Sequence, residues 1–257
     1  MTDTPINVVY PDADDLHLRI ALGTCRFEAR PGKVQGWVAG TCHDPTGNRT
    51  PKIIRAEERR VTVTEAKPYF ERIPIRFGGI PRYELEFGKE WPFALTIETG
   101  ASEFDLDLGG VRLKSLTVRQ RAGRFNLNFS APNPHPMSLL DISSGEAGIE
   151  LENLANANFS RMRLSGEAAG YELDFGGELK WNAEVRIETS FSGVDITVPR
   201  SIAARIVAET TLGTVDVGPG FTPSEGAFLT ERGMAGNRPL LTIHAEVRLG
   251  ALQIRAT

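Results

Sequence analysis

Gly148-Ile-Glu-Leu151 and Gly170-Tyr-Glu-Leu173 are two copies of one short phrase, and their spacing decides the fold of this 257-residue chain. In each copy a turn residue precedes an apolar–polar–apolar strand. From Phe104 the first apolar position of the phrase advances by 21, 24, 22, 23 and 21 residues. A fixed period of this size is typical of stacked repeat architectures. The other copies are Gly100-Ala-Ser-Glu-Phe104-Asp-Leu106, Gly123-Arg-Phe125-Asn-Leu127, Gly193-Val-Asp-Ile196 and Gly213-Thr-Val215-Asp-Val217.

The repeat predicts an all-β fold. Each unit is expected to hold two short strands with a turn containing Gly, Ser or Thr between them, which leaves no room for helices. Alternation of apolar and polar residues turns one face of each strand inward. We therefore predict a right-handed β-solenoid with single-stranded, β-helix-like coils of roughly 22 residues, or a sandwich of two stacked sheets. The first strand of each unit is expected at Leu95/Ile97, Leu116/Val118, Leu140/Ile142, Met162/Leu164, Val185/Ile187 and Ile206/Ala208.

The chain is predicted to form a single domain over residues 1–257. Residues 1–90 are expected to form a strand-rich N-terminal cap, residues 91–217 the repeat stack, and residues 218–238 a long loop. Residues 239–257 are expected to supply two closing strands that end the stack. Terminal units of a stack are usually atypical, because they must cover its open edges.

The cap region contains several strand-like segments after a loose lead-in at residues 1–14. Residues 42–52 contain Pro, Gly and Asn and are predicted to be a loop. The repeated phrase also occurs near both ends of the chain, as Gly23-Thr-Cys25-Arg-Phe27 and Gly250-Ala-Leu252-Gln-Ile254. Strands are expected at residues 17–22, 25–29, 34–39, 60–64, 72–77 and 83–87.

Composition narrows the function. The formal net charge of −4 argues against nucleic-acid binding, which needs clustered Lys and Arg. The segment Met1-Thr-Asp-Thr-Pro-Ile-Asn7 lacks the basic and apolar regions of a signal peptide, and no run of 18 apolar residues occurs. These features favour a cytoplasmic protein, which a partner could hold at a membrane.

No motif for catalysis, a metal or a cofactor stands out. The four histidines are scattered, and no phosphate-binding loop, dinucleotide fingerprint or nucleophile elbow occurs. Cys25 is predicted to be a buried thiol, and Cys42 lies in a turn-like stretch. The three tryptophans, Trp37, Trp91 and Trp181, are read as core or cap residues rather than as the lining of a sugar groove. We therefore predict no catalytic residue, no cofactor and no dedicated metal site.

One outward-facing polar residue lies inside each copy of the phrase. If consecutive units stack, these residues form a ladder with rungs about 4.8 Å apart. Repulsion between neighbouring carboxylates would be on the order of 3 kcal/mol before screening. A calcium ion or a carbohydrate could relieve it, and so could solvent or Arg163 and Arg186 on the companion strands. The weak candidate ladder consists of Asp105, Asn126, Glu150, Glu172, Asp195 and Asp216.

Phe221 and Phe228 are the candidate partner contacts, because aromatic residues on a long loop have a weaker structural reason to be there. The alternative is that they fold back as a lid over the edge of the stack.

By residue 217 the repeats resemble a known group of families. Phe191-Ser-Gly-Val-Asp-Ile-Thr-Val-Pro199, followed by Ala204 to Val217, resembles the C-terminal domain of LiaF-type cell-wall-active-antibiotic response proteins. The segment is also similar to the related adhesin-like, or "toast-rack", domains of bacterial envelope-stress proteins. The resemblance covers about residues 91–257. It implies an all-β, non-catalytic module that senses or organises the cell envelope, although the membrane helices usual in these families are not seen.

These observations favour a non-enzymatic interaction module, which binds a protein partner or associates with itself through a sheet edge. Two alternatives stay open: a polysaccharide-active β-helix enzyme, and a calcium- or carbohydrate-binding protein. Surface acids converging in a cleft beside Arg or Lys would favour the enzyme. A flat face would favour the module.

Overall fold

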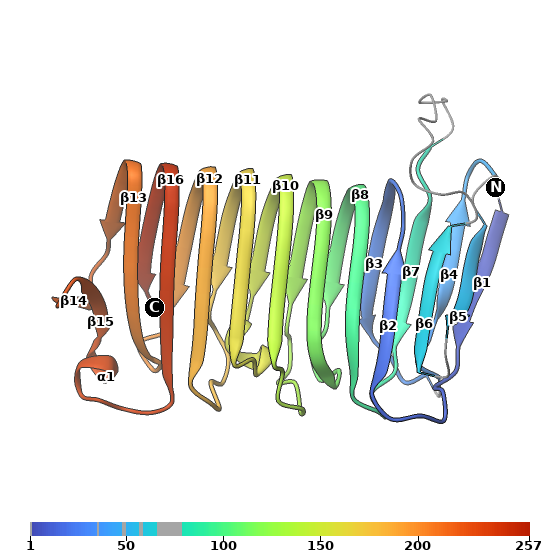
Figure 1. The fold of residues 1–257 in the computed structure, drawn as a ribbon, viewed down its shortest axis with the longest axis horizontal. Coiled ribbons are helices and arrows are strands. Elements are labelled where there is room, and N and C mark those ends of the chain that lie inside the picture. Colours follow the sequence, from blue (N-terminus) through green and yellow to red (C-terminus); the bar gives the residue numbers. More distant parts are fainter. Residues whose placement is uncertain (1, 35, 48–49, 57–58, 66–78) are drawn as a thin grey trace.

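The computed structural model describes residues 2–34, 36–47, 50–56, 59–65 and 79–257. It is one mixed sheet of 16 strands, folded over into two layers (Figure 1). Seven long strands of 14 to 17 residues make up most of the stack. They are β8 (Phe93–Asp107), β9 (Leu113–Asn128), β10 (Leu139–Glu152), β11 (Arg161–Asp174), β12 (Ala183–Val198), β13 (Ala203–Val217) and β16 (Leu240–Ala256).

Each coil is a single bent strand, and not two strands separated by a turn as expected. The strand rises through one layer, bends over at the top and descends through the other layer (Figure 1). We call these parts the first arm, the crest and the second arm. Pairing to the neighbouring coil continues through the crest with one residue skipped, as between Thr189 and Phe191 of β12. The hydrogen-bonded ladder therefore never stops, and the predicted β-solenoid is confirmed with a simpler coil.

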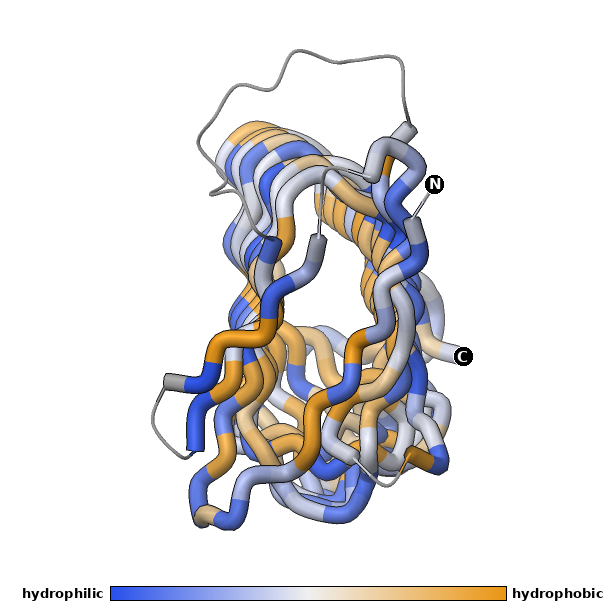
Figure 2. Tube along the Cα trace, turned by 90° about the vertical axis from the view of Figure 1, so that its right-hand side faces the viewer, coloured by the Kyte–Doolittle hydropathy of each residue, from blue (hydrophilic) through white to orange (hydrophobic). Residues whose placement is uncertain are grey.

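The register aligns equivalent positions of the phrase. Phe104 pairs with Phe125, and the row continues through Ile149, Tyr171 and Val194. Phe104, Ile149 and Val194 are only 2%, 2% and 1% exposed, so the predicted inward face is correct. The two layers enclose one hydrophobic core along the stack. Figure 2 shows the layers end-on, with hydrophobic and hydrophilic residues alternating along the coils.

The order of coils in space departs from their order in the chain. β16 pairs in parallel with β12 on one side and with β13 on the other, so it lies between them instead of closing the stack. The predicted loop at 218–238 makes this path possible, because it leads the chain past β13 and back. It is not all loop: it contains β14 (Phe221–Ser224), β15 (Ala227–Thr230) and the short helix α1 (Glu231–Met234).

The N-terminal part continues the same two layers. β2 (Leu16–Ala21) and β3 (Cys25–Pro31) together form a coil, because β2 pairs with the first arm of β8 and β3 with its second arm. Phe27 lies beside Phe104, which confirms that the phrase near Gly23 belongs to the repeat. The second-arm layer then adds β7 (Arg82–Phe87), β4 (Val38–Asp44) and β1 (Thr2–Val8), and the first-arm layer adds β6 (Arg60–Glu65) and β5 (Pro51–Ala56).

The sequence missed two of these strands. β1 was read as a loose lead-in, and β5 overlaps a segment read as a loop, because both are polar and contain proline. The strand expected at residues 72–77 lies outside the described residues.

Glycines of the phrase have two different roles. Gly250 has a φ of 146°, and a Cβ atom there would overlap the backbone carbonyl of Ser192 on β12. Gly170 is extended, and nothing lies within 4 Å of where its Cβ atom would be. The first glycine is required by the close approach of two coils, whereas the fold does not require the second.

We expect opposite effects from the same substitution at these two positions. Gly250→Ala should lower the free energy of unfolding by about 1–3 kcal/mol, because the backbone must shift to relieve the overlap. Gly170→Ala should raise it by up to about 1 kcal/mol, because alanine loses less conformational entropy in a strand. Urea unfolding of both variants measures the difference. Equal destabilisation by both would contradict the assignment.

The lower corners of the stack are joined by buried asparagine side chains. Asn133, between the two prolines of the corner at 132–134, is 0% exposed. Its Oδ1 accepts hydrogen bonds from the backbone N–H groups of Leu113 (3.2 Å) and His135 (3.0 Å). Its Nδ2 donates to the carbonyl oxygens of Leu113 (3.0 Å) and Ala157 (3.2 Å). One side chain thus connects three successive corners.

Asn133→Ala should destabilise the protein by about 2–3 kcal/mol, since it leaves several buried backbone groups without partners. Asn126→Ala, on the outer face of a second arm, serves as the matched control and should change stability by less than about 0.5 kcal/mol. Thermal unfolding followed by circular dichroism compares them. Similar melting temperatures for the two variants would show that the corner bonds contribute little.

Candidate functional site

The acidic ladder exists on the outer face of the second arms, but only in part. Glu150 pairs in register with Glu172, and Glu172 with Asp195. Asp216 does not lie beside Asp195 as predicted, because Gln253 of the inserted strand β16 separates them. The charged core of the ladder is therefore three adjacent carboxylates, with Asn126 on one side and Gln253 on the other.

The ladder continues toward the N-terminal end through residues that the sequence analysis did not include. Asp105 lies beside Glu28, and Glu28 beside Glu84. Arg82 relieves the repulsion here, with its Nη2 atom 2.9 Å from Glu28 Oε2 and 2.9 Å from Glu84 Oε1. The hydrogen bond to Glu28 raises the pKa of the Arg82 guanidinium.

Arg163 and Arg186 do not neutralise the ladder, contrary to the sequence-based suggestion. Both lie on first arms, where they pair in register with each other on the opposite face of the stack. Arg186 instead binds Glu188 on its own strand. The physical reason is the bend at the crest, which sends the two halves of each coil to different layers.

Solvent surrounds the three central carboxylates. Within the part of the chain that the structure describes, neither Glu150 nor Glu172 has an ion pair within 4 Å, and Asp195 has only Arg255 Nη2 at 3.9 Å. No three His, Cys, Asp or Glu side chains of that part converge in a way that could hold a metal ion. Binding of a cation along the ladder stays a prediction.

A charged groove of about 530 Å³ lies at the N-terminal end of the same face. Its carboxylates stand beside arginines, which is the composition expected for the enzyme alternative. The arginines are engaged: Arg82 holds Glu28, and Arg30 Nη2 lies 3.1 Å from Glu86 Oε1. Asp107 caps a corner by accepting hydrogen bonds from Gly109 N (2.9 Å) and Ser130 Oγ (2.6 Å).

The thiols and tryptophans resolve differently from the sequence analysis. Cys25 and Cys42 are both 0% exposed, and Cys42 lies within β4 rather than in a turn. Burial raises the pKa of the Cys42 thiol, which makes it a poor nucleophile. Trp37 is fully buried as predicted, but Trp91 and Trp181 are each 56% exposed.

Phe221 of β14 and Phe228 of β15 are partly buried and pack against the end of the core. With Ala227, which is 2% exposed, they form a lid over the lower part of the last coil, which is the alternative considered for them. Their role as partner contacts stays a prediction.

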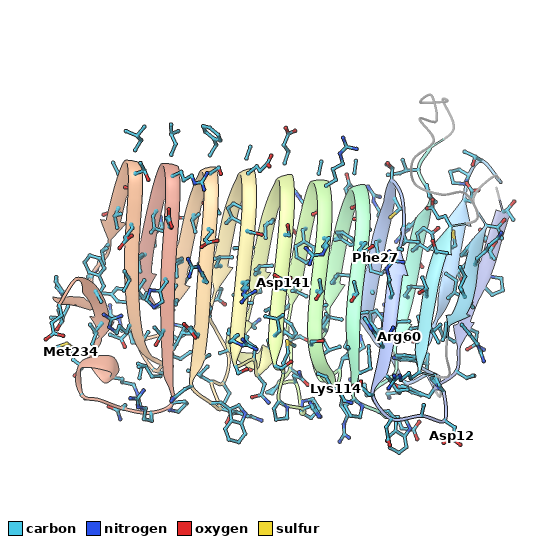
Figure 3. The ribbon with its side chains drawn as sticks, in the orientation of Figure 1. Asp12, Phe27, Arg60, Lys114, Asp141 and Met234 are labelled. Atoms are coloured by element: carbon cyan, nitrogen blue, oxygen red, sulfur yellow. The ribbon has the colours of Figure 1, made fainter. Side chains whose placement is uncertain are left out.

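The most exposed apolar surface was missed by the sequence analysis. Phe191, Leu249 and Leu212 lie side by side at the crest of β12, β16 and β13. Their exposed fractions are 63%, 45% and 66%. We call these three residues the crest row; Figure 3 shows the side chains that stand along the crest. A signal was available, since each is an apolar residue at a position where the alternation predicts an outward side chain.

Among the described residues, no helix is long and apolar enough to span a bilayer.

Comparisons with known proteins agree with this architecture. The family model for the N-terminal domain of toast_rack, DUF2154, matches residues 2–151. The match overlaps the resemblance expected over 91–257 only at 91–151, and it adds the N-terminal coils. No curated protein matches the chain.

Solved structures share the fold at low sequence identity. One, from Clostridium sporogenes, bears a name that proposes a role in cell adhesion. It is 15% identical, covers 100% of this chain and 99% of its own, and has a TM-score of 0.55. Another, from Bacteroides fragilis, has a name that proposes an adhesin. It is 9% identical, with coverage of 99% and 96% and a TM-score of 0.47.

Removing the central charge of the ladder should stabilise the protein. Glu172→Gln is expected to raise the free energy of unfolding by about 0.5–1 kcal/mol at low ionic strength, because Glu172 faces a carboxylate on each side. The gain should shrink in about 1 M salt. Asp216→Asn is the matched control, and it should have a smaller effect because Gln253 is its neighbour.

The same two variants test cation binding. Millimolar calcium should raise the melting temperature of the wild type, and not that of Glu172→Gln, if the ladder binds the ion. An unchanged wild-type melting temperature rejects calcium binding, and the acids are then a solvated face.

Proposed function

Because this chain belongs to the toast-rack family, whose N-terminal domain matches residues 2–151, we propose that it acts as a non-enzymatic interaction module. Residues 1–257 work as one domain in this proposal. The stack presents a rigid surface to a protein partner or to a further copy, and no catalytic step is required. Phe221 and Phe228 stay candidates for additional contact near the same end.

The crest row carries this proposal. Three large apolar side chains on neighbouring strands form a contiguous exposed patch, and such patches mark interaction sites more often than isolated apolar residues do. Phe191 stands next to Leu249, which stands next to Leu212, so the patch reaches the last coil of the stack.

The scaffold beneath the crest row suits binding. Each coil is hydrogen-bonded to its neighbours from first arm to second arm, and its inward residues belong to one continuous core. Little conformational freedom is left to lose at the crest when a partner binds, and this lowers the entropic cost of association.

Adhesion or envelope-stress sensing is the setting that we propose. It is supported by the resemblance to LiaF-type and adhesin-like domains, and by the adhesion role proposed in the name of the Clostridium sporogenes protein. A partner that is itself attached to the membrane would hold the chain at the envelope.

A second candidate, action on a polysaccharide, is favoured by one observation. The groove at the N-terminal end combines Glu28, Asp105 and Asp107 with Arg30 and Arg82. Incubation with acidic polysaccharides, followed by measurement of new chain ends, tests it. Activity lost in Arg82→Gln would support this candidate, and no activity on any polymer would leave the binding module as the function.

Photo-crosslinking in the producing cells tests the interaction module. A crosslinking amino acid in place of Phe191 should give discrete adducts, because this position lies in the contact surface. The same amino acid in place of Glu146, an exposed crest residue of β10, should give few. Identical band patterns at the two positions, or no adduct at either, would contradict binding through the crest row.

A further inference from the structure

The outer edge of β13 is unpaired over most of its length. On its inner side β13 pairs with β16 from Ala203 to Val217. On its outer side, in the described part of the chain, only Arg205 and Ile206 have strand partners, both in β15. Residues 207–217 therefore present a free row of backbone donors and acceptors, which is a template for adding another strand.

This edge lacks the protection found at the other end of the stack. The edge strands β1 and β5 contain Pro5 and Pro51, and proline cannot donate a backbone hydrogen bond. The free stretch of β13 reads Val207-Ala-Glu-Thr-Thr-Leu-Gly-Thr-Val-Asp-Val217, with no proline and no lysine. Leu212 and Val215 on it are 66% and 36% exposed.

The free stretch is symmetric about the crest. It runs from 207 to 217, so Leu212 is its middle residue, with five residues on each side. The first arm rises in one layer and the second arm descends in the other (Figures 1 and 2). A two-fold axis through the crest, perpendicular to the stack, exchanges the layers and makes the first arm of one copy antiparallel to the second arm of the other.

We propose that β13 is the interface of a symmetric dimer, in which two copies of this chain pair their free edges in antiparallel fashion about Leu212. The inference rests on the proposed interaction function and names its partner. The two sheets then continue through the interface, and the crest row of one copy meets that of the other at Leu212.

The charges on the edge agree with this register. Centred on Leu212, the pairing places Glu209 opposite Val215 of the second copy, and Asp216 opposite Ala208. No acid of the edge faces an acid, so the arrangement avoids the like-charge pairs that destabilise sheets. The apolar contacts at Leu212 and Val215 lose their exposure to solvent.

A second copy in this orientation fits better than a head-to-tail neighbour. Head-to-tail stacking would place β1 or β5 against β13 and generate an open filament, and Pro5 and Pro51 oppose pairing there. The two-fold contact closes after two copies. The turn between β14 and β15 lies beside the lower limit of the free stretch, and thus sets the end of the pairing.

Sedimentation velocity over a range of concentrations tests the proposal with the full chain. The wild type should sediment as a dimer. Leu212→Lys, at an exposed position where the fold tolerates charge, should weaken dimerisation about tenfold or more, since two like charges then meet at the axis. Ile54→Lys, a matched change at a half-exposed residue of β5, should leave the dimer intact.

Disulfide trapping gives the second readout. Leu212→Cys should form an intermolecular disulfide under mild oxidation, because residues opposite each other on antiparallel strands lie within bonding range. Leu249→Cys, one strand further in, should not. Cys25 and Cys42 are buried and do not compete.

A wild type that is monomeric at all concentrations would overturn the dimer, and so would filaments that are abolished by Ile54→Lys. These results leave the interaction module standing if the Phe191 crosslinker still captures a different protein. Absence of any crest adduct, together with a monomer, overturns both proposals.

Discussion

Parallel register between successive coils is the constraint on which the rest of the structure depends. Because every coil spans the same two arms, equivalent positions fall beside each other, and one apolar row after another is sheltered between the layers. Phe104, Phe125 and Ile149 are neighbours for this reason alone. The same register also forces Glu150 and Glu172 together on the outer face, so core stability and surface repulsion have a common origin.

The repeat could be predicted because inward and outward positions alternate in every copy of the phrase. Spatial order could not be: Gly250-Ala-Leu252 fits beside β12 as well as the phrase at Gly213 does, and the choice depends on contacts along the entire coil. The interrupted ladder follows from that choice. β1 and β5 escaped prediction because pairing with a neighbour, and not their own polar, proline-containing sequence, holds them in the sheet.

The two ends of the stack differ in kind. At the N-terminal end, proline-containing strands finish both layers. At the other end, β14, β15 and α1 cover the lower part of the first arm of β13, while its crest and second arm stay free. The apolar crest residues gather at this free end. The binding properties proposed for the family member therefore concentrate at one pole of the molecule, and the acidic face runs along its side.

The position of β16 has a consequence for how the molecule is made. β13 leaves the ribosome before β16, yet β16 must be in place before β13 has a neighbour of its own kind. Throughout the intervening synthesis the coil from 203 to 217 has no long strand beside it, and β12 offers an unfilled side. Maturation of this pole is thus a late, concerted insertion, and any truncation that removes β16 costs the protein two coils instead of one.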